Sequence, residues 1–363
     1  MYGFEPTEEQ RMLIEAVQRF ALNDLRAAAH DADESGELPP ALIQKGWDLG
    51  VLQASIPEAY GGMGEHSAVT GALAAEELGN GDVAAGLAVM APATYALPLL
   101  LAGSEEQKTS LLPPVVEGAW KPYAAAFVEP DHDFYAAEMR TTAKTNAKGY
   151  VLDGVKAMVP FADRAEGLIV YAAYEGKTQA FVVPPQAEGL TVGEREKWLG
   201  LGALPLFPLR LESVHVPEEA RLGGAAGHDP AVLLSASQVA VAAMAVGLSR
   251  ASFDYALRYA KERQVFETPI AQKQSIAFSL AEMAIDIEAI RLLMWEAAWK
   301  LDAGQDAAQS AYLALTGASD MAMMVTDRAV QILGGHGYIR EHPVERWMRN
   351  GRGISTFPGL AMV

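Results

Sequence analysis

The hydrophobic spacing of this chain changes twice, and this change limits the folds open to it more than any other feature. Apolar residues follow a helical period up to about Lys121, alternate in short runs broken by Pro and Gly, and return to a helical period at Pro230. Short alternating runs with turn residues between them are typical of a small β-sandwich or barrel. We therefore expect an N-terminal α-helical domain at 1–120, a middle β-domain at 121–224 and a C-terminal α-helical bundle at 225–363.

Local signals place individual elements within these three parts. Thr7-x-x-Gln10 and Ser104-x-x-Gln107 are capping-box patterns, and the first opens a helix that we expect to reach about Ala29. One apolar stripe of a long C-terminal helix steps by three and four residues: Ile276, Leu280, Met283, Ile287, Ile290 and Met294. Three helices of about thirty residues, each roughly 45 Å long, indicate a bundle. We expect strands at 123–128, 138–145, 150–159, 167–173, 178–183 and 207–216.

The composition excludes several classes of partner and chemistry. The chain has 363 residues and a formal net charge of −18, which argues against nucleic acid and against an anionic membrane surface, because both attract Lys and Arg. It contains no cysteine, so disulfides, thiolate catalysis and Cys-ligated metals are excluded. The start, Met1 to Pro6, has neither the basic nor the apolar region of a signal peptide. We therefore expect a cytoplasmic protein.

Two uncharged runs, Val83–Gly103 and Pro230–Ser249, are long enough to raise the question of a membrane span. The first contains two prolines and has acidic flanks, and the second is rich in Ala and contains Ser and Gln. Neither has the basic flank that is typical of a span. We expect both runs to form helices buried inside the protein or at a subunit contact.

The last long helical pattern ends in a glycine-rich motif, Gln331-Ile332-Leu333-Gly334-Gly335-His336-Gly337-Tyr338. Glycine lets a chain leave a helix with positive φ and brings bare backbone N–H groups close to a ligand. Such N–H groups suit an anion such as a diphosphate. Taken alone, the motif fits an ordinary helix C-terminus equally well.

Together with Arg263-Gln264-Val265-Phe266 and with Gln274, eleven residues after Arg263, this motif resembles those of the acyl-CoA dehydrogenase family. The resemblance covers essentially the whole chain, because that family has the same order of helical, β and helical domains. It implies an FAD cofactor whose ADP half is held across a subunit interface by six residues: Arg263, Phe266, Gln274, Gln331, Gly334 and Gly335. One departure touches this set, since Glu267 replaces the Gly that usually follows the Phe.

The resemblance also implies a reaction, but the catalytic base is missing. In the family a carboxylate removes the α-proton of an acyl-CoA while the β-hydrogen leaves as hydride to the flavin. Most members carry this base in an Ile-Tyr-Glu-Gly-Thr segment, whose lead-in is kept here at 343–350, but the base position is Pro358 if Gly359 matches the family's Gly. A minority place the base on an earlier helix, at the position of Ser237 here. We therefore assign no catalytic residue.

The residues that surround the flavin ring in the family are replaced as well. Val128 and Phe134 stand where a Thr-Glu-Pro-x-x-Gly-Ser-Asp stretch has its Thr and its Ser. Met158 and Pro160 stand where a Trp-Ile-Thr segment has its Trp and its Thr, and a proline also removes a backbone N–H. The groups offered across an interface are therefore present, and those of the chain's own site are not.

Three hypotheses follow. The leading one is a subunit that contributes the ADP clamp to a hetero-oligomeric acyl-CoA dehydrogenase, a dimer or tetramer packed through the C-terminal helices, whose homologous catalytic partner supplies the base for the acyl-CoA. The second is a self-sufficient FAD enzyme whose base has moved, for example to Glu129 or Asp133. The third is a flavin-free binding or regulatory homologue. We predict no metal site, because Pro343 breaks the helix that the acidic and His residues of 341–345 would need.

Overall fold

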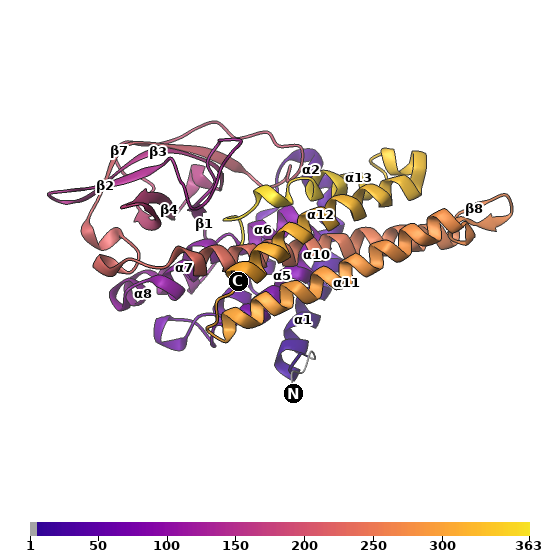
Figure 1. Cartoon of the computed structure of the whole chain (residues 1–363), viewed down its shortest axis with the longest axis horizontal. Coiled ribbons are helices and arrows are strands. Elements are labelled where there is room, and N and C mark those ends of the chain that lie inside the picture. The colour runs from indigo at the N-terminus through magenta and orange to yellow at the C-terminus, as the bar shows by residue number, and fades with distance from the viewer. Residues whose placement is uncertain (1–5) are drawn as a thin grey trace.

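The computed structural model describes residues 6–363, and it places a sheet at one end of the molecule with long helices running to the other end (Figure 1). The predicted order of helical, β and helical parts is confirmed. Nine helices come before the sheet in the described residues: α1 (Glu8–Phe20), α2 (Arg26–Ser35), α3 (Pro40–Trp47), α4 (Val51–Ala54), α5 (Ala68–Gly81), α6 (Val83–Met90), α7 (Ala93–Ala102), α8 (Glu105–Leu111) and α9 (Pro113–Val116). Residues 1–5, on which the signal-peptide prediction rests, lie outside the described residues.

The first helix is longer than its sequence pattern predicts. Thr7 and Gln10 form the expected capping box, but the helix does not end near Ala29. A π-helical turn at Ala21–Leu25 joins α1 to α2, and the helix continues to Ser35, where Gly36 with φ +74° ends it. The Ser104 capping box opens α8 as predicted.

The β-domain is a seven-stranded sheet with the order β1-β4-β2-β3-β7-β6, in which β5 also pairs with β4. Strands β1 and β2 run parallel to β4, and the other pairs are antiparallel. The strands are β1 (Tyr123–Ala126), β2 (Thr142–Asn146), β3 (Gly149–Pro160), β4 (Gly167–Tyr174), β5 (Lys177–Val183), β6 (Leu190–Val192) and β7 (Leu206–Val216). The short strand β6 has no counterpart in the sequence prediction.

One predicted strand begins four residues late. Residues 138–141, expected as part of a strand at 138–145, are not in the sheet, and β2 starts at Thr142. The physical reason is a buried carboxylate: Glu129 accepts the backbone N–H groups of Arg140 and Thr141, both at 2.8 Å. Those N–H groups are therefore not available to a neighbouring strand.

The C-terminal bundle consists of three long helices, α10 (Pro230–Glu262), α11 (Gln274–Asp302) and α12 (Ala308–Leu333), followed by α13 (Val344–Gly351). The expected stripe of α11 is confirmed, since Leu280, Met283, Ile287 and Met294 are buried and the two remaining members of the stripe are partly buried. A two-residue hairpin, β8 (Gln264–Val265) and β9 (Thr268–Pro269), lies between α10 and α11.

Helix α10 crosses the N-terminal helix α5 at very short range. A Cβ on Gly247 of α10 would lie 1.9 Å from the Glu76 carbonyl oxygen, and a Cβ on Gly79 of α5 would lie 2.4 Å from the Met244 carbonyl oxygen. By length and composition α10 could cross a membrane, but 83% of its most apolar stretch is buried inside the molecule. The run at 83–103 forms α6 and α7, which are bent by 50° at their junction.

Candidate functional site

The structure brings the ends of α10 and α12 together at the end of the molecule opposite the sheet (Figure 1). The Tyr259 hydroxyl of α10 and the His336 Nδ1 atom, just after α12, are 2.8 Å apart. Arg263 lies one turn beyond Tyr259 and donates its backbone N–H to the Tyr259 carbonyl at 2.8 Å. Gln274 is the first residue of α11. These contacts place Arg263, the predicted clamp residue, beside the glycine motif. The link runs through the pair of Tyr259 and His336, which the sequence analysis did not single out.

The hairpin after Arg263 presents Phe266 to the solvent. Phe266 and Glu267 are the two turn residues, with φ of +54° and +63°, as in a type I′ turn. The Phe266 side chain is 89% exposed, and the hairpin is tied back by the Ile270 N–H, which donates to the Arg263 carbonyl at 2.9 Å. An exposed aromatic ring held by a turn is available for contact with a ligand or another chain.

The fold requires two of the three glycines of the motif, for different reasons, and leaves the third free. Gly334 ends α12 with φ +60° and ψ −130°, which favours glycine. Gly337 packs too closely for a side chain, because its Cβ would lie 2.4 Å from the Val330 carbonyl oxygen. At Gly335 φ is not positive, and a Cβ would meet no atom within 4 Å among the described residues. The backbone of Gly335 is therefore open to a group from outside the chain.

The polar side chains at this end are free to bind something else. Arg263, Gln274 and Gln331 are exposed, and within residues 6–363 none of their side chains makes a hydrogen bond or an ion pair. A guanidinium group grips phosphate oxygens through paired, charge-assisted hydrogen bonds. With the open backbone of Gly335 close by, the donor set suits a diphosphate.

The two positions at which the family carries a base meet in space, although they are far apart in the sequence. The Gly359 N–H, directly after Pro358, donates to the Ser237 hydroxyl oxygen at 2.6 Å, and Ser237 is buried. Gly359 has φ +91°, and a Cβ there would lie 2.4 Å from the Cβ of Phe127. The two positions that the resemblance assigns to a base therefore lie side by side, and neither Pro358 nor Ser237 carries a carboxylate.

The side chains at positions that contact a flavin ring in the family pack against other side chains of this chain. The Phe127 ring packs edge-on against Phe134 and Tyr171, with ring centroids 5.8 Å and 4.9 Å away. Val128 and Met158 are buried in the same core as the helices.

Met158 also has a protein partner for its backbone. It lies at an irregularity in the pairing of β3 with β7 and has φ +56°. Its N–H donates to the Glu196 carboxylate at 3.0 Å. Sequence reasoning missed Glu196, because nothing in the local pattern links residues so far apart.

Glu129 and Asp133, the two candidates for a relocated base, are both held in ion pairs. Glu129 is buried and also accepts a hydrogen bond from the Lys156 ammonium at 2.9 Å. Burial by itself raises the pKa of Glu129, but the Lys156 charge and the hydrogen bonds from Thr141 and Arg140 bring it below its ordinary value. Burial lowers the pKa of Lys156 to about 8 against the opposing effect of Glu129. Asp133 is exposed and pairs with Arg140 at 2.8 Å.

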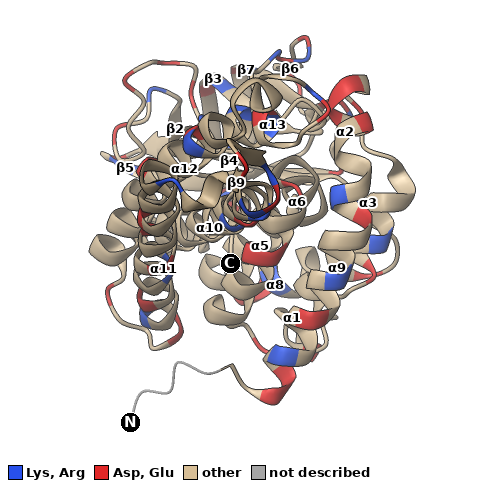
Figure 2. Cartoon of the chain, turned by 90° about the vertical axis from the view of Figure 1, so that its right-hand side faces the viewer, with Lys and Arg blue, Asp and Glu red and all other residues tan. Residues whose placement is uncertain are grey.

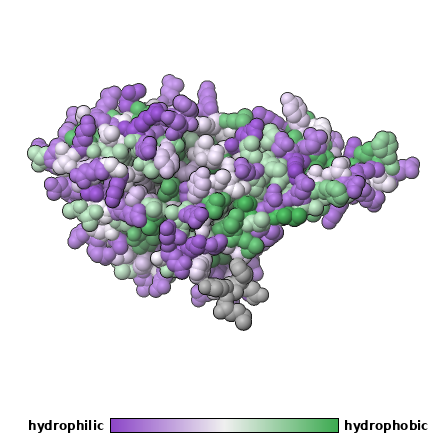
Figure 3. Space-filling view, in the orientation of Figure 1, coloured by the Kyte–Doolittle hydropathy of each residue, from purple (hydrophilic) through white to green (hydrophobic). Residues whose placement is uncertain are grey.

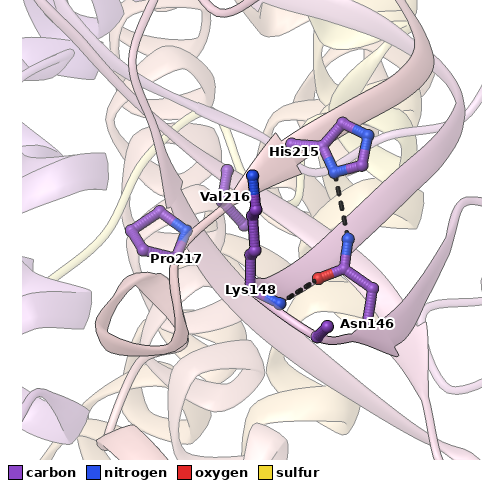
Figure 4. Close-up of a pocket in the computed structure, with 6 residues that line it drawn as sticks. Asn146, Lys148, His215, Val216 and Pro217 are labelled. Atoms are coloured by element: carbon purple, nitrogen blue, oxygen red, sulfur yellow. Dashed lines mark hydrogen bonds between the residues drawn. The ribbon is translucent and has the colours of Figure 1, made fainter.

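An open cavity lies elsewhere, at the tip of the β2–β3 hairpin beside the end of β7 (Figure 4). It has a volume of about 540 Å³ and is lined by Asn146, Lys148, His215, Pro217 and their neighbours. The Asn146 amide nitrogen and His215 Nδ1 are 3.0 Å apart, and the Lys148 N–H donates to the Asn146 amide oxygen. We assign no chemistry to it, because these polar groups satisfy one another.

Comparison with known proteins gives consistent results over the whole chain. Family models match at 7–119 (acyl-CoA dehydrogenase, N-terminal domain), 124–214 (middle domain) and 232–361 (C-terminal domain). The probable acyl-CoA dehydrogenase YngJ of Bacillus subtilis is 35% identical over 99% of this chain and 97% of its own length. The structure of butyryl-CoA dehydrogenase from Megasphaera elsdenii matches with a TM-score of 0.89 at 33% identity, over 99% of this chain and 96% of that one. The FAD complex of PigA also matches with a TM-score of 0.89, at 28% identity and the same coverage.

Two of the matching structures contain the flavin: the PigA structure is an FAD complex, and that of a glutaryl-CoA dehydrogenase from Mycobacterium smegmatis is a complex with FADH2. The residues of this chain suit FAD on one side only. The exposed Arg263, Gln274 and Gln331, with the open backbone at Gly335, would hold its diphosphate part. The positions that contact the ring in the family offer it few polar groups, because Phe134 packs against Phe127 and Met158 already donates its N–H to a carboxylate. The part of this chain that suits the diphosphate of FAD is therefore polar and exposed, whereas the positions that contact the flavin ring in the family are not.

Proposed function

The chain belongs to the acyl-CoA dehydrogenase family of FAD-dependent oxidoreductases, and from this premise we propose that it is the flavin-completing subunit of a hetero-oligomeric acyl-CoA dehydrogenase. In this role the chain offers its ADP clamp to an FAD whose ring lies in a homologous catalytic subunit. The partner binds the acyl-CoA and supplies the carboxylate base. We place the complex in the cytoplasm.

One contrast carries the proposal. The clamp side chains Arg263, Gln274 and Gln331 are exposed and uncommitted in the described residues. Two positions that contact the ring in the family instead carry Phe134 and Met158, which pack against other side chains of this chain. A homo-oligomer needs both halves from one sequence. This sequence provides one half, so the other half must come from a different chain.

The clamp residues bind and position the cofactor but carry out no chemistry. Arg263 offers a charged, planar fork of donors to the phosphates. The two glutamines offer amide donors and acceptors, and Gly335 offers a backbone approach without a side chain in the way. FAD, when bound, supplies the hydride-accepting chemistry of the family. Proton removal from the substrate falls to the partner, because Pro358 and Ser237 cannot accept a proton from carbon at these positions.

Two alternatives are less well supported. A self-sufficient enzyme would need a free base. The carboxylate oxygens of Glu129 already accept hydrogen bonds from the Lys156 ammonium and from the Arg140 and Thr141 N–H groups. A flavin-free homologue would leave the uncommitted donors around Gly335 without a ligand. Flavin absorbance of the purified chain, alone and with its partner, separates these two from the leading proposal.

The test is co-expression with a homologous chain of the same genome that keeps the Glu of Ile-Tyr-Glu-Gly-Thr and the Trp-Ile-Thr segment. We expect the complex to hold FAD and the isolated chain to hold little. Arg263→Ala should weaken FAD binding by about ten- to hundredfold, since losing a charged hydrogen bond costs roughly 1.5–3 kcal/mol. Arg263→Lys should restore only part of it, because Lys keeps the charge but not the fork.

The control is Arg210→Ala, the same chemical change at an exposed position of β7 that is paired with Glu212. It should leave FAD occupancy unchanged. Full occupancy in Arg263→Ala, or one FAD per isolated wild-type chain, would overturn the proposal.

A further inference from the structure

We propose that His336 binds a phosphate group of FAD as a further residue of the ADP clamp, that Tyr259 orients its ring, and that the charged ring binds more tightly. The inference rests on the proposed function, because its ligand is the diphosphate of the FAD that the clamp holds. It adds a binding residue that the resemblance does not assign, and it makes the strength of FAD binding depend on pH.

The ring of His336 lies beside two parts of the clamp. In the chain, His336 directly follows Gly335, whose backbone is open to a group from outside. In space, its Nδ1 atom is 2.8 Å from the hydroxyl of Tyr259, which precedes Arg263 by four residues and therefore lies on the same face of the helix end. Figure 2 looks onto this end of the molecule, and hydrophilic side chains lie next to the apolar tip of the hairpin in Figure 3.

Although His336 is exposed, its ring is held on two sides. The His342 ring stacks on it with an interplanar angle of 21° and ring centroids 5.4 Å apart, and the Tyr259 ring stands edge-on at 5.9 Å. His342 is held in turn by the Tyr255 hydroxyl, which is 2.7 Å from its Nδ1 atom. A side chain that is already ordered loses little conformational entropy when it binds a ligand. His336 is therefore prepared for binding.

One ring nitrogen of His336 has a partner and the other is free. The Nδ1 atom is bonded to Tyr259, whereas the Nε2 atom makes no hydrogen bond within residues 6–363. A neutral imidazole has one donor nitrogen and one acceptor nitrogen. We assign the Tyr259 O–H as the donor to Nδ1, which places the ring proton on Nε2. A phosphate oxygen that accepts this proton would satisfy both nitrogens.

A charged His336 binds a phosphate more strongly, because hydrogen bonds from ionised donors are the stronger ones. Histidine is the side chain that changes its charge near neutral pH. Two stacked imidazolium rings would repel each other, so the stack takes up one proton, and a bound diphosphate favours it on the exposed ring. Neither histidine forms an ion pair in the described part of the chain. The charge of His336 is thus available to the ligand.

The elements that pack around the two histidines carry other charged groups. These are Arg258 and Glu262 on α10, Asp327 and Arg328 on α12, and Arg340, Glu341 and Glu345 around His342. Arg340 pairs with Glu34, and Arg258 lies over the Tyr255 ring. Carboxylates and guanidinium groups keep their charges between about pH 6 and about pH 8. Burial raises the pKa of Tyr255, so its hydroxyl stays protonated there as well.

A role confined to packing predicts a different result. The stack would then only hold the turn at 334–342 against α10. A phenylalanine in place of His336 keeps the stacked ring but removes both nitrogens. It would leave FAD binding unchanged if packing were the only role, and it would weaken FAD binding if a nitrogen holds the phosphate.

The first experiment compares His336→Phe with His215→Phe in the complex with the co-expressed homologous chain described above. His215 is also exposed and also has a partner at its Nδ1 atom, but it belongs to the sheet. FAD is removed, and its rebinding is followed by flavin fluorescence at about pH 6 and about pH 8. We expect His336→Phe to weaken binding about tenfold near pH 6 and about threefold near pH 8. His215→Phe should leave binding unchanged at both values.

The wild-type complex should therefore gain affinity for FAD as the pH falls, and His336→Phe should lose most of this gain. His336→Gln keeps a donor without a charge, so it should bind like wild type near pH 8 and more weakly near pH 6. Thermal unfolding checks that each variant folds. Wild-type affinity of His336→Phe at both pH values, or a pH profile equal to that of wild type, would overturn the proposal.

The second experiment tests Tyr259 as the residue that orients the ring. Tyr259→Phe should weaken FAD binding about threefold near pH 8 and less near pH 6. The reason is that a neutral ring needs Tyr259 to keep its proton on Nε2, whereas a charged ring carries protons on both nitrogens. The control is Tyr174→Phe, which removes a hydroxyl 3.0 Å from Thr145 in the sheet and should change neither value. A larger loss near pH 6 than near pH 8 would overturn the role of Tyr259.

Failure of this inference can be told apart from failure of the proposed function. If Arg263→Ala strips FAD from the complex while His336→Phe binds it like wild type at both pH values, His336 is not part of the clamp and the clamp stands. If the Arg263→Ala complex keeps its FAD, the proposed function is wrong, whatever His336→Phe does.

Discussion

At the scale of single residues, Glu267 holds a backbone conformation that suits glycine. Its φ of +63° lies in the left-handed region, which costs a residue with a side chain roughly 1–2 kcal/mol. Glycine would remove this cost but would lose more entropy on folding. We expect Glu267→Gly to raise the free energy of unfolding by roughly 0.5–1 kcal/mol, measured by urea denaturation. Glu188→Gly, at an exposed residue without positive φ, should lower it instead.

Glu129 is a second residue whose contacts predict a measurable effect. Glu129→Gln leaves the buried Lys156 ammonium without its counter-charge, so we expect a loss of about 3–5 kcal/mol at pH 7. The pKa of Glu129 is below its ordinary value, so its contribution is present above about pH 4.3 and is lost as pH falls through the folded-state pKa. The difference between wild type and variant in urea denaturation should therefore shrink as the pH falls below about 4.3.

Combining Lys156→Met with Glu129→Gln should recover much of that stability, because no buried charge remains. Dehydrogenation by the isolated wild-type chain that Glu129→Gln abolishes without loss of stability would contradict this account and support a relocated base.

At the scale of elements, the crossing of α5 and α10 depends on glycine. A methyl group at Gly247 would meet the Glu76 carbonyl oxygen and the Asn80 nitrogen, 1.9 Å and 2.6 Å away, so the helices would have to separate. We expect Gly247→Ala to cost about 1–3 kcal/mol, as overpacking does elsewhere, in thermal and urea unfolding. Ser249→Ala, also buried on α10, should change stability little. Equal effects of the two substitutions would show that the crossing tolerates a side chain.

The elements also show what the sequence could predict. The fold class and the family were predicted correctly from the sequence. Helical spacing over some thirty residues and motifs such as the one ending at Tyr338 are strong local signals that made this possible. Strand β6 was missed because three residues carry no readable alternation. The hairpin before α11 was missed because Glu267 replaces the glycine that would have signalled its turn. The bond of Met158 to Glu196 and the ion pair of Glu129 join distant parts of the chain, and no local pattern announces them.

At the scale of the whole molecule, the exposed ADP clamp and the replaced ring contacts together predict how much FAD the complex binds. A complex of this chain with its catalytic partner should hold one FAD per unequal pair, because the reciprocal site would be built from Phe134 and Met158, which pack against other side chains of this chain. The isolated chain should show negligible acyl-CoA dehydrogenation, since general-base catalysis supplies roughly 10²–10⁴-fold of rate. Flavin absorbance against protein concentration measures the first, and dye reduction the second. Two FAD per pair would contradict the account.

The open backbone at Gly335 separates what folding requires from what function requires. Gly337 is fixed by packing and Gly334 by its backbone angles, so changes there should be rejected by any screen for stability. Gly335 meets neither demand within this chain. We expect this from two scans of all single substitutions, one that measures protein abundance and one that measures flavin retention in the complex. Substitutions at Gly335 should be tolerated in the abundance scan and should lower flavin retention in the other. Other positions that tolerate substitution for abundance but not for flavin retention would identify the residues that contact the partner or its flavin.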